Sequence, residues 1–347
     1  MNKTVMTVNR LPVPTWNWLK MNGTDVERPE AVSRGNCDVS LPEGVKASDG
    51  AEFAFGVETD LDDSLSESGI VPQTYSVSGT VTVPLRLKFS LGDSSVNAVD
   101  IEAAENSRVS VLMDYGAAES VAGSCGVRTR LKLARNARVQ LVQIQDLPEK
   151  ACFFNDVAVQ CAEGAEISLV QLVQGCGKTF MGTSCSLEGL SSAFNSDIGY
   201  VVKGREKLDI NSVAVHRGRQ TSSRINVLGV LRDEGSKIFR GTIDFRRGAL
   251  QAVGNEKEDV LLMDDRVVNQ TIPVILCEEE DVEGNHGATI GRLDDGLLFY
   301  MESRGLSRAQ VYEMMARARM AAACGKIADA GLRDEIAHRF DEGGTDK

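Results

Sequence analysis

The segments Asn106-Ser-Arg-Val-Ser-Val-Leu112, Asn136-Ala-Arg-Val-Gln-Leu-Val142 and Gly164-Ala-Glu-Ile-Ser-Leu-Val170 decide the fold, because they align with one another without gaps. Their first residues lie 30 and 28 positions apart. Each segment opens with a turn-forming residue and then alternates as a β-strand does. A fourth segment, Gly235-Ser-Lys-Ile-Phe-Arg-Gly241, repeats the opening of the same phrase.

A strand phrase that recurs at this spacing is typical of a solenoid, in which each coil stacks on the coil before it. One coil cannot bury its own inner face, whereas stacked coils share a continuous core. Short β-branched runs of period two extend from about residue 75 to 276 and include the segment 75–83. At about 28 residues a coil, this region predicts roughly seven coils.

The alternative all-β architectures are a sandwich and a propeller. A sandwich is expected to show hairpin dipeptides such as Asn-Gly between its strands, and residues 75–276 contain none. The aromatic content of 5% also suits a narrow interior filled by Val, Ile, Leu and Ala. We therefore expect a mainly β chain whose core, residues 71–292, is a β-solenoid.

Residues 1–70 are expected to form an N-terminal strap and an acidic linker. The strap, residues 9–20, carries Trp16 and Trp18, and we expect it to dock on the body through these aromatic rings. The linker is expected at residues 58–69, which are acidic and poor in large apolar side chains.

Residues 293–347 switch to helical periodicity and predict a small α-helical subdomain. A first helix begins near Asp294, a good N-cap residue, and ends at Gly305. Ser307 and Gln310 predict a capping box at the start of a second helix. The apolar face of that helix is expected to consist of Val311, Met314, Met315, Ala318 and Ala322. A last helix carries apolar residues four apart, at Leu332, Ile336 and Phe340.

Charge and composition exclude several classes of partner. The chain has 38 Lys and Arg against 50 Asp and Glu, a formal net charge of −12. A nucleic-acid backbone or an anionic membrane surface would therefore be repelled. The sequence has no apolar run of the length that spans a bilayer, and residues 1–10 lack the apolar region of a signal peptide, so we expect a cytoplasmic protein.

The eight cysteines are spread along the chain without a Cys-x-x-Cys pair. In a reducing compartment we expect them to be thiols that mostly behave as small buried hydrophobes. Their spacing offers no preformed zinc or cluster site.

The usual motifs of nucleotide binding and nucleophilic catalysis are incomplete. Gly175-Cys-Gly-Lys-Thr179 resembles part of a phosphate-binding loop, but Leu172 stands where that motif has its first glycine. We interpret the segment as a turn between coils and expect no tightly bound nucleotide. No Gly-x-Ser-x-Gly motif accompanies the histidines, which are His216, His286 and His338. A solenoid that binds or cleaves polysaccharide is the alternative function, although its aromatic platforms and carboxylate cluster are not evident.

His286 stands out from the other histidines because of its neighbours. It lies in Glu283-Gly-Asn-His-Gly-Ala-Thr-Ile-Gly291, where small residues leave the imidazole accessible. Just before it, Cys277-Glu-Glu-Glu-Asp281 adds a thiol and carboxylates at the end of an apolar strand. On these features alone, a turn histidine is the more common interpretation.

The segment Asn285-His-Gly-Ala-Thr-Ile-Gly-Arg-Leu-Asp294, continued by Leu298-Phe-Tyr-Met-Glu-Ser-Arg-Gly-Leu306, resembles the C-terminal signature of the SufB/SufD family of iron–sulfur cluster assembly proteins, and most of all the SufD type. Residues 9–18 also resemble the opening of short SufD-type proteins. The clear similarity covers residues 9–20 and about 235–320.

This resemblance implies a right-handed parallel β-helix core with helical flanks, in agreement with the solenoid inferred from the repeats. It implies a non-catalytic scaffold subunit that pairs with a SufB-type partner and docks the ABC-type ATPase SufC, which would bind the ATP. The family histidine implicated in cluster formation at the interface of the two scaffold subunits corresponds to His286. A transient iron–sulfur cluster would be shared with the partner there.

One departure from the family pattern concerns thiols. Well-known SufD sequences have Cys two residues before the histidine, where this chain has Gly284. A thiol contribution would then come from Cys277 or from the partner. The C-terminal helical part would receive the ATPase, with candidate docking residues Leu297, Tyr300, Arg304, Val311, Met314 and Met315. A homodimer formed edge to edge by the solenoid strands is a further option, because open sheet edges need cover.

Overall fold

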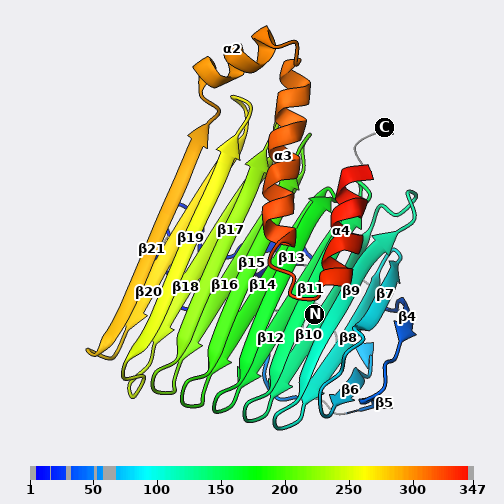
Figure 1. Cartoon of the computed structure of the whole chain (residues 1–347), viewed down its shortest axis with the longest axis vertical. Coiled ribbons are helices and arrows are strands. Elements are labelled where there is room, and N and C mark those ends of the chain that lie inside the picture. Colours follow the sequence, from blue (N-terminus) through cyan, green and yellow to red (C-terminus); the bar gives the residue numbers. More distant parts are fainter. Residues whose placement is uncertain (1–4, 16, 29–32, 51–52, 58–67, 343–347) are drawn as a thin grey trace.

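Two parallel β-sheets form the opposite walls of a solenoid, and successive strands alternate between the walls (Figure 1). The computed structural model describes residues 5–15, 17–28, 33–50, 53–57 and 68–342, apart from the side chains of 341 and 342. Within these residues the solenoid makes about eight turns, against the seven that the sequence predicts. The prediction of a mainly β solenoid is confirmed.

We call the ten-stranded sheet the strap wall and the nine-stranded sheet the helix wall, after the segments that cover them. In sheet order, the strap wall consists of β20 (Val268–Cys277), β18 (Ser236–Phe245), β16 (Lys207–His216), β14 (Lys178–Leu187), β12 (Cys152–Cys161), β10 (Ser124–Leu133), β8 (Ser95–Ala103), β6 (Gln73–Val77) and β5 (Val45–Asp49), with β3 (Ser33–Arg34) beside β8. The helix wall consists of β21 (Val282–Arg292), β19 (Ala252–Leu262), β17 (Ser222–Leu231), β15 (Ala193–Val202), β13 (Glu166–Gly175), β11 (Arg138–Leu147), β9 (Arg108–Ala117), β7 (Leu85–Leu91) and β4 (Asn36–Ser40). Strands β4 and β5 pair antiparallel with β7 and β6 and so end each wall at the N-terminal side.

The sequence repeat marks one corner of the solenoid. Arg138 pairs with Arg108 on one side and with Glu166 on the other, so the three aligned segments are neighbours in the helix wall. The residues that open them, Asn106, Asn136 and Gly164, have φ angles of 60°, 55° and 64°. Asn and Gly adopt this left-handed conformation most readily, which explains the repeated turn residue.

The fourth aligned segment does not belong to this corner. Gly235 leads into β18 of the strap wall, at the opposite corner, where Asp233 has the left-handed φ of 57°. The shared sequence pattern therefore indicates a turn that leads into a strand, but it does not indicate which wall the strand joins. The strand expected over residues 75–83 also ends early, at Val77, because Gly79 turns the chain with a φ of 67°.

The remaining turn and cysteine predictions are confirmed. Strand β13 ends at Gly175 and β14 begins at Lys178, so the phosphate-loop-like segment is a turn between coils. All eight cysteines are free thiols. Five of them are buried, namely Cys125, Cys161, Cys176, Cys185 and Cys324.

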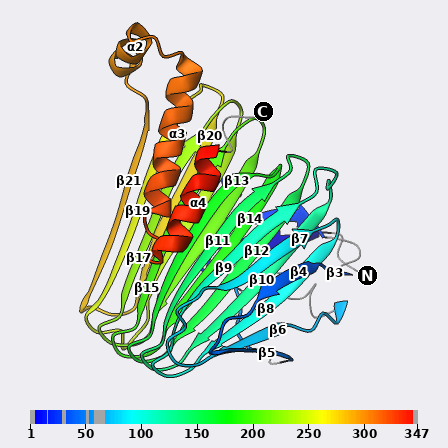
Figure 2. The same cartoon turned by 45° about the vertical axis from the view of Figure 1, so that its right-hand side comes forward.

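Three helices follow β21 with the predicted caps. Asp294 caps α2 (Asp295–Ser303), and Ser307 and Gln310 form the capping box of α3 (Arg308–Cys324). Helices α3 and α4 (Ala330–Glu342) lie on the outer face of the helix wall (Figure 2). None of the described helices is long and apolar enough to cross a membrane.

The predicted buried face of α3 is partly wrong. Met314, Ala318 and Ala322 are exposed. The buried residues are Val311, Tyr312, Ala316, Met320, Ala323 and Cys324. The apolar period of the helix did not include Tyr312, whose ring is buried while its hydroxyl donates a 2.6 Å hydrogen bond to the carbonyl oxygen of Met263.

The N-terminal strap, which here includes the described residues between 5 and 28, packs on the strap wall, but not through Trp18. Strands β1 (Val5–Val8) and β2 (Thr24–Glu27) pair antiparallel, and Met6 and Val8 pack against Phe154 and Phe180 on the strap wall. Trp18, in the turn that follows, is 99% exposed. Trp16 and most of the expected acidic linker, 58–67, lie outside the described residues.

A buried ion pair anchors the strap to the wall. Arg240, 1% exposed, pairs with Asp209 and donates a 2.7 Å hydrogen bond to the carbonyl oxygen of Met21. Asn9 donates a 2.8 Å hydrogen bond to the same Asp209 carboxylate. The Met21 carbonyl oxygen and the Asn9 side chain therefore fix the strap together with the packing of Met6 and Val8, where aromatic rings were expected to do so.

His216 is a fully buried histidine of the solenoid. Its Nδ1 and Nε2 lie 2.8 Å from the hydroxyls of Thr221 and Ser223, and its ring centroid is 4.8 Å from that of Phe245. Burial lowers the pKa of His216 from 6.5 to about 4. The folded chain therefore keeps this imidazole neutral where the unfolded chain would protonate it.

We predict that His216→Gln flattens the pH dependence of stability. Neutral His216 contributes stability that is present above pH 6.5 and is lost as the pH falls toward 4. The loss amounts to about 3 kcal/mol in the wild type. Urea midpoints between pH 7 and 4 measure it. His338→Gln, on the exposed face of α4, should keep the wild-type profile, and an equally steep profile for His216→Gln contradicts the prediction.

Candidate functional site

The last coil, formed by β20 and β21, is an open end of the solenoid. These strands are the last in both walls, and no described strand pairs with their outer sides. Ile275 and Ile290 are 38% and 44% exposed, whereas their register neighbours in the coil below, Ile243 and Val260, are buried. The inward-facing side chains of this coil thus meet solvent where a further coil would otherwise cover them.

His286 lies on the lumen side of the open end. It is the register partner of Glu256 in β19, and register partners in parallel strands project from the same face. Glu256 faces the lumen, because a Cβ built on Gly241 of the opposite wall would lie 2.0 Å from its Oε2. His286 therefore stands at the mouth of the solenoid, one strand above the Glu256 carboxyl group.

A buried charged cluster occupies the layer beneath this mouth. Lys237 of the strap wall and Glu258 of the helix wall form an ion pair, with side chains 0% and 1% exposed. Thr271 of β20 donates a 2.7 Å hydrogen bond to Glu258 and accepts one of 3.2 Å from Lys237. Glu256 lies beside the pair, 6% exposed, and makes no hydrogen bond through its side chain within the described part of the chain. We call Lys237, Glu256, Glu258 and Thr271 the lumen cluster.

Burial and the charges of neighbouring members shift the pKa values of Glu256 and Lys237 in the lumen cluster. Burial, and after it the charge of Glu258, raises the pKa of Glu256 from 4.5 to about 8. Burial also lowers the pKa of Lys237, against the opposing effect of Glu258. Buried charges are expensive unless they are paired, and groups with perturbed pKa values are frequent at functional sites. The open end is therefore the best candidate site of the molecule.

Cys277, the thiol proposed to assist His286, lies on the preceding strand in register with Phe245 of the coil below. Cys277 ends β20 at the corner of the coil, is exposed, and its Sγ lies 2.9 Å from the carbonyl oxygen of Glu279. A Cβ at Gly284 would lie 3.0 Å from the Phe245 ring and 3.3 Å from Ile275. Position 284 therefore faces the lumen on the same side as His286, and a cysteine there would lie two residues from the imidazole on one face of β21.

Sequence reasoning missed the lumen cluster, although a signal was present. In β19 the lumen-facing positions follow a period of two, through Gly254, Glu256, Glu258 and Val260. The equivalent positions of the preceding strand β17 are apolar, at Ile225 and Val227. Two acidic residues in register with a buried apolar pair therefore indicate charge inside the solenoid.

No three His, Cys, Asp or Glu side chains of the described residues are arranged to hold a metal ion. Among the described residues, the open end supplies the imidazole of His286 and the nearby Glu256 carboxyl group. Any metal bound there would need ligands beyond these two.

The expected ATPase-docking residues divide into exposed and buried ones. Leu297, Tyr300 and Met314 are 44%, 51% and 42% exposed, and Arg304 lies 5.2 Å from the centre of the Tyr300 ring. Val311, a residue of α3, is 1% exposed, so it cannot belong to a docking surface. Met315 is partly buried against the cluster that contains Tyr312. Phe299, which the sequence interpretation passed over, is 72% exposed. Helix α2 carries most of this surface and projects beyond the solenoid (Figure 1).

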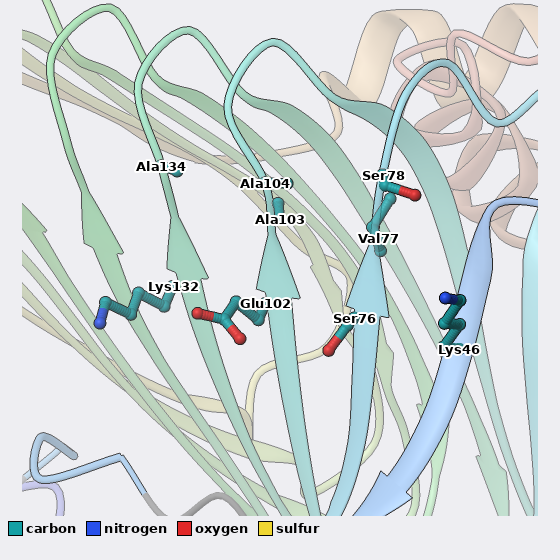
Figure 3. Close-up of a pocket in the computed structure, with 9 residues that line it drawn as sticks. All are labelled: Lys46, Ser76, Val77, Ser78, Glu102, Ala103, Ala104, Lys132 and Ala134. Carbon is teal, nitrogen blue, oxygen red and sulfur yellow. The ribbon is translucent and has the colours of Figure 1, made fainter.

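Two other hollows lie on the strap wall. The smaller, about 290 Å³, is lined by Ser76, Glu102 and Lys132 of consecutive strands, together with Lys46 of β5 (Figure 3). The larger, about 860 Å³, lies beneath the strap and includes one aromatic residue, Phe180, whose ring stacks on Phe154. Neither hollow displays the row of aromatic platforms that a polysaccharide site needs.

The lumen cluster gives a direct stability prediction. Lys237→Met should destabilise the chain by about 3–5 kcal/mol, because it leaves Glu258 buried without its partner. Adding Glu258→Gln to Lys237→Met should restore most of this loss. Urea unfolding at pH 7 measures both variants. A double variant that is less stable than Lys237→Met would show that the ion pair is not the source of the effect.

A family model described as SUF system FeS cluster assembly, SufBD core domain, matches residues 89–319, which include the walls from β8 to β21, the lumen cluster and His286. The iron–sulfur cluster assembly protein SufD of Escherichia coli K12 is 24% identical over 240 residues, or 69% of this chain and 57% of that protein.

Two Bacillus subtilis proteins are similar as well. Its SufD is 24% identical over 160 residues, or 46% of this chain and 37% of that protein. Its SufB is 28% identical over 156 residues, or 45% of this chain and 33% of that protein. The chain thus spans between about a third and somewhat more than half of the length of these relatives.

Proposed function

Because this chain belongs to the SufBD family of the SUF system for iron–sulfur cluster assembly, we propose that it is a cytoplasmic, non-catalytic scaffold subunit of a SUF complex. The observation that carries the proposal is the open end, where His286 stands over the lumen cluster. The iron–sulfur cluster is the cargo of this complex. One imidazole cannot hold a cluster alone, so we infer that ligands of a partner subunit complete the site.

A SufB-type partner is the proposed occupant of the open end. Edge strands present unpaired main-chain donors and acceptors, and strand addition satisfies them. Both walls end in such strands here, β20 and β21, and apolar side chains such as Ile290 are exposed beside them. A second copy of this chain would fit the same edges when the partner is absent. Light scattering of the isolated chain tests that homodimer, since a monomer at every concentration excludes it.

A SufC-type ATPase is the proposed partner of α2. The exposed Phe299, Leu297 and Tyr300 give this helix an apolar surface that no described residue covers, and Met314 of α3 is exposed as well. In this arrangement the partner binds ATP. The alternative function, binding or cleavage of polysaccharide by the solenoid, lacks a supporting observation, because neither hollow of the strap wall offers aromatic platforms.

We predict that His286→Ala leaves folding and complex formation intact but lowers the amount of cluster formed at least fivefold. His286 is exposed on an edge strand, so its removal costs little packing. The measurement is iron and sulfide content after anaerobic co-expression with SufB-type and SufC-type partners. His338→Ala is the matched control and should retain the wild-type yield. An unchanged yield for His286→Ala would remove its role in assembly.

We predict that Phe299→Ser weakens binding of a SufC-type partner at least tenfold, because an exposed aromatic side chain near the centre of an interface contributes a large share of the binding free energy. Leu190→Ser, at a solenoid turn where Leu190 is 46% exposed, is the control. Calorimetric titration measures both. Deleting residues 294–347 is a poorer test, because α3 and α4 also cover the apolar outer face of the helix wall. Equal affinities of Phe299→Ser and wild type would exclude α2 as the docking site.

A further inference from the structure

Glu256 is the one member of the lumen cluster that lacks a partner. Lys237 neutralises Glu258, and Thr271 bonds to both. Glu256 stands beside them, nine-tenths buried, and its carboxyl group makes no hydrogen bond with any described residue. An ionised carboxylate in this position would cost several kcal/mol without a cation beside it, and the raised pKa of Glu256, about 8, reflects that cost.

The surrounding residues leave space for the Glu256 side chain. A side chain larger than hydrogen at position 241 of the opposite wall would collide with the carboxyl group, so Gly241 is what admits it. Strands of one wall lie about 4.8 Å apart, and His286 is the next residue in register toward the solvent. Imidazole and carboxylate ligands bind a metal ion at about 2 Å, so one ion can bridge two side chains at this separation.

We propose that Glu256 is a second ligand for ferrous iron at the open end, so that Glu256 and His286 bind one ion from adjacent strands. The proposal rests on the proposed function and names the iron-binding half of its site. Nitrogen and oxygen ligands of this kind suit Fe²⁺. The other coordination positions of the ion face the mouth, where sulfide or a ligand of the partner subunit can reach it.

The other members of the lumen cluster are positioning residues in this arrangement. The pairing of Lys237 with Glu258 keeps the ammonium group on Glu258 and leaves Glu256 available to the ion. Thr271 fixes the second oxygen of Glu258 through its 2.7 Å hydrogen bond. The three ionisable side chains together carry a net charge of −1 when both carboxyl groups are ionised, which favours a divalent cation.

The test is anaerobic titration of the full chain with Fe(II), followed by competition with a chromogenic chelator. We expect the wild type to bind one Fe(II), and Glu256→Gln and His286→Ala each to weaken the dissociation constant at least tenfold. The double variant should lose less binding free energy than the sum of the two single losses, because both side chains contact the same ion. Glu283→Gln, an exposed carboxylate on β21, is the matched control and should bind as the wild type does.

Folding is checked by thermal melting of each variant. Glu256→Gln keeps the shape of the side chain, and Glu256→Ala serves as a second variant if the amide does not fold. Wild-type affinity in a folded Glu256 variant overturns the proposal, as does an absence of Fe(II) binding by the wild type at millimolar concentration. Additive losses in the double variant also overturn it, because they indicate two separate sites.

Cluster yield in the complex separates this proposal from the proposed function. If His286→Ala lowers the yield and Glu256→Gln changes neither the yield nor Fe(II) affinity, the scaffold function stands and the assignment of Glu256 falls. If Glu256→Gln weakens Fe(II) binding tenfold while both variants assemble cluster normally, the iron site stands and the assembly role of His286 falls.

Discussion

The structure depends on one constraint, namely that every coil of the solenoid needs a neighbour to cover its inner face. Within the walls the next coil covers this face, and neighbouring strands pair in register, as Arg138 of β11 does with Glu166 of β13. On the N-terminal side, the antiparallel strands β4 and β5 supply this cover. The last coil has no such neighbour in the part of the chain that the structure describes. Its inner face is therefore the part of the lumen that a partner or a ligand can reach.

The same constraint explains where charge is tolerated. Deep in the lumen, apolar side chains and rings such as Tyr115 and Phe153 pack along the axis, with centroids 5.1 Å apart. One layer below the open end, Lys237, Glu256 and Glu258 replace them. A buried ion pair adds little net stability compared with apolar residues, so its presence at this depth agrees better with a functional role than with a structural one.

Much of the fold was predictable, because repeats and caps are local. The left-handed turn at Asn106 and Asn136 and the capping box at Ser307 appear directly in the sequence. The errors arose where burial depends on a distant segment. Trp18 was expected to dock, but the strap is fixed by Met6, Val8 and the buried Arg240. Val311 was expected on the docking surface, but it is buried.

The candidate site was predictable only in part. The family signature drew attention to His286, and Gly284 lies on the same face of β21. Glu256 and Glu258 lie on a different coil, so their place beside His286 depends on register across 30 residues. The sequence alone does not give that register, because it does not show which residues of β19 face inward.

The central claim is that the open end is the surface that a SufB-type partner covers. Hydrogen exchange of the backbone amides of β20 and β21, with and without that partner, tests it most directly. The account predicts that amides of Val282–Arg292 become strongly protected in the complex while those of β9 and β11 stay unchanged. Unchanged exchange in β20 and β21, with protection elsewhere on the solenoid, would contradict it.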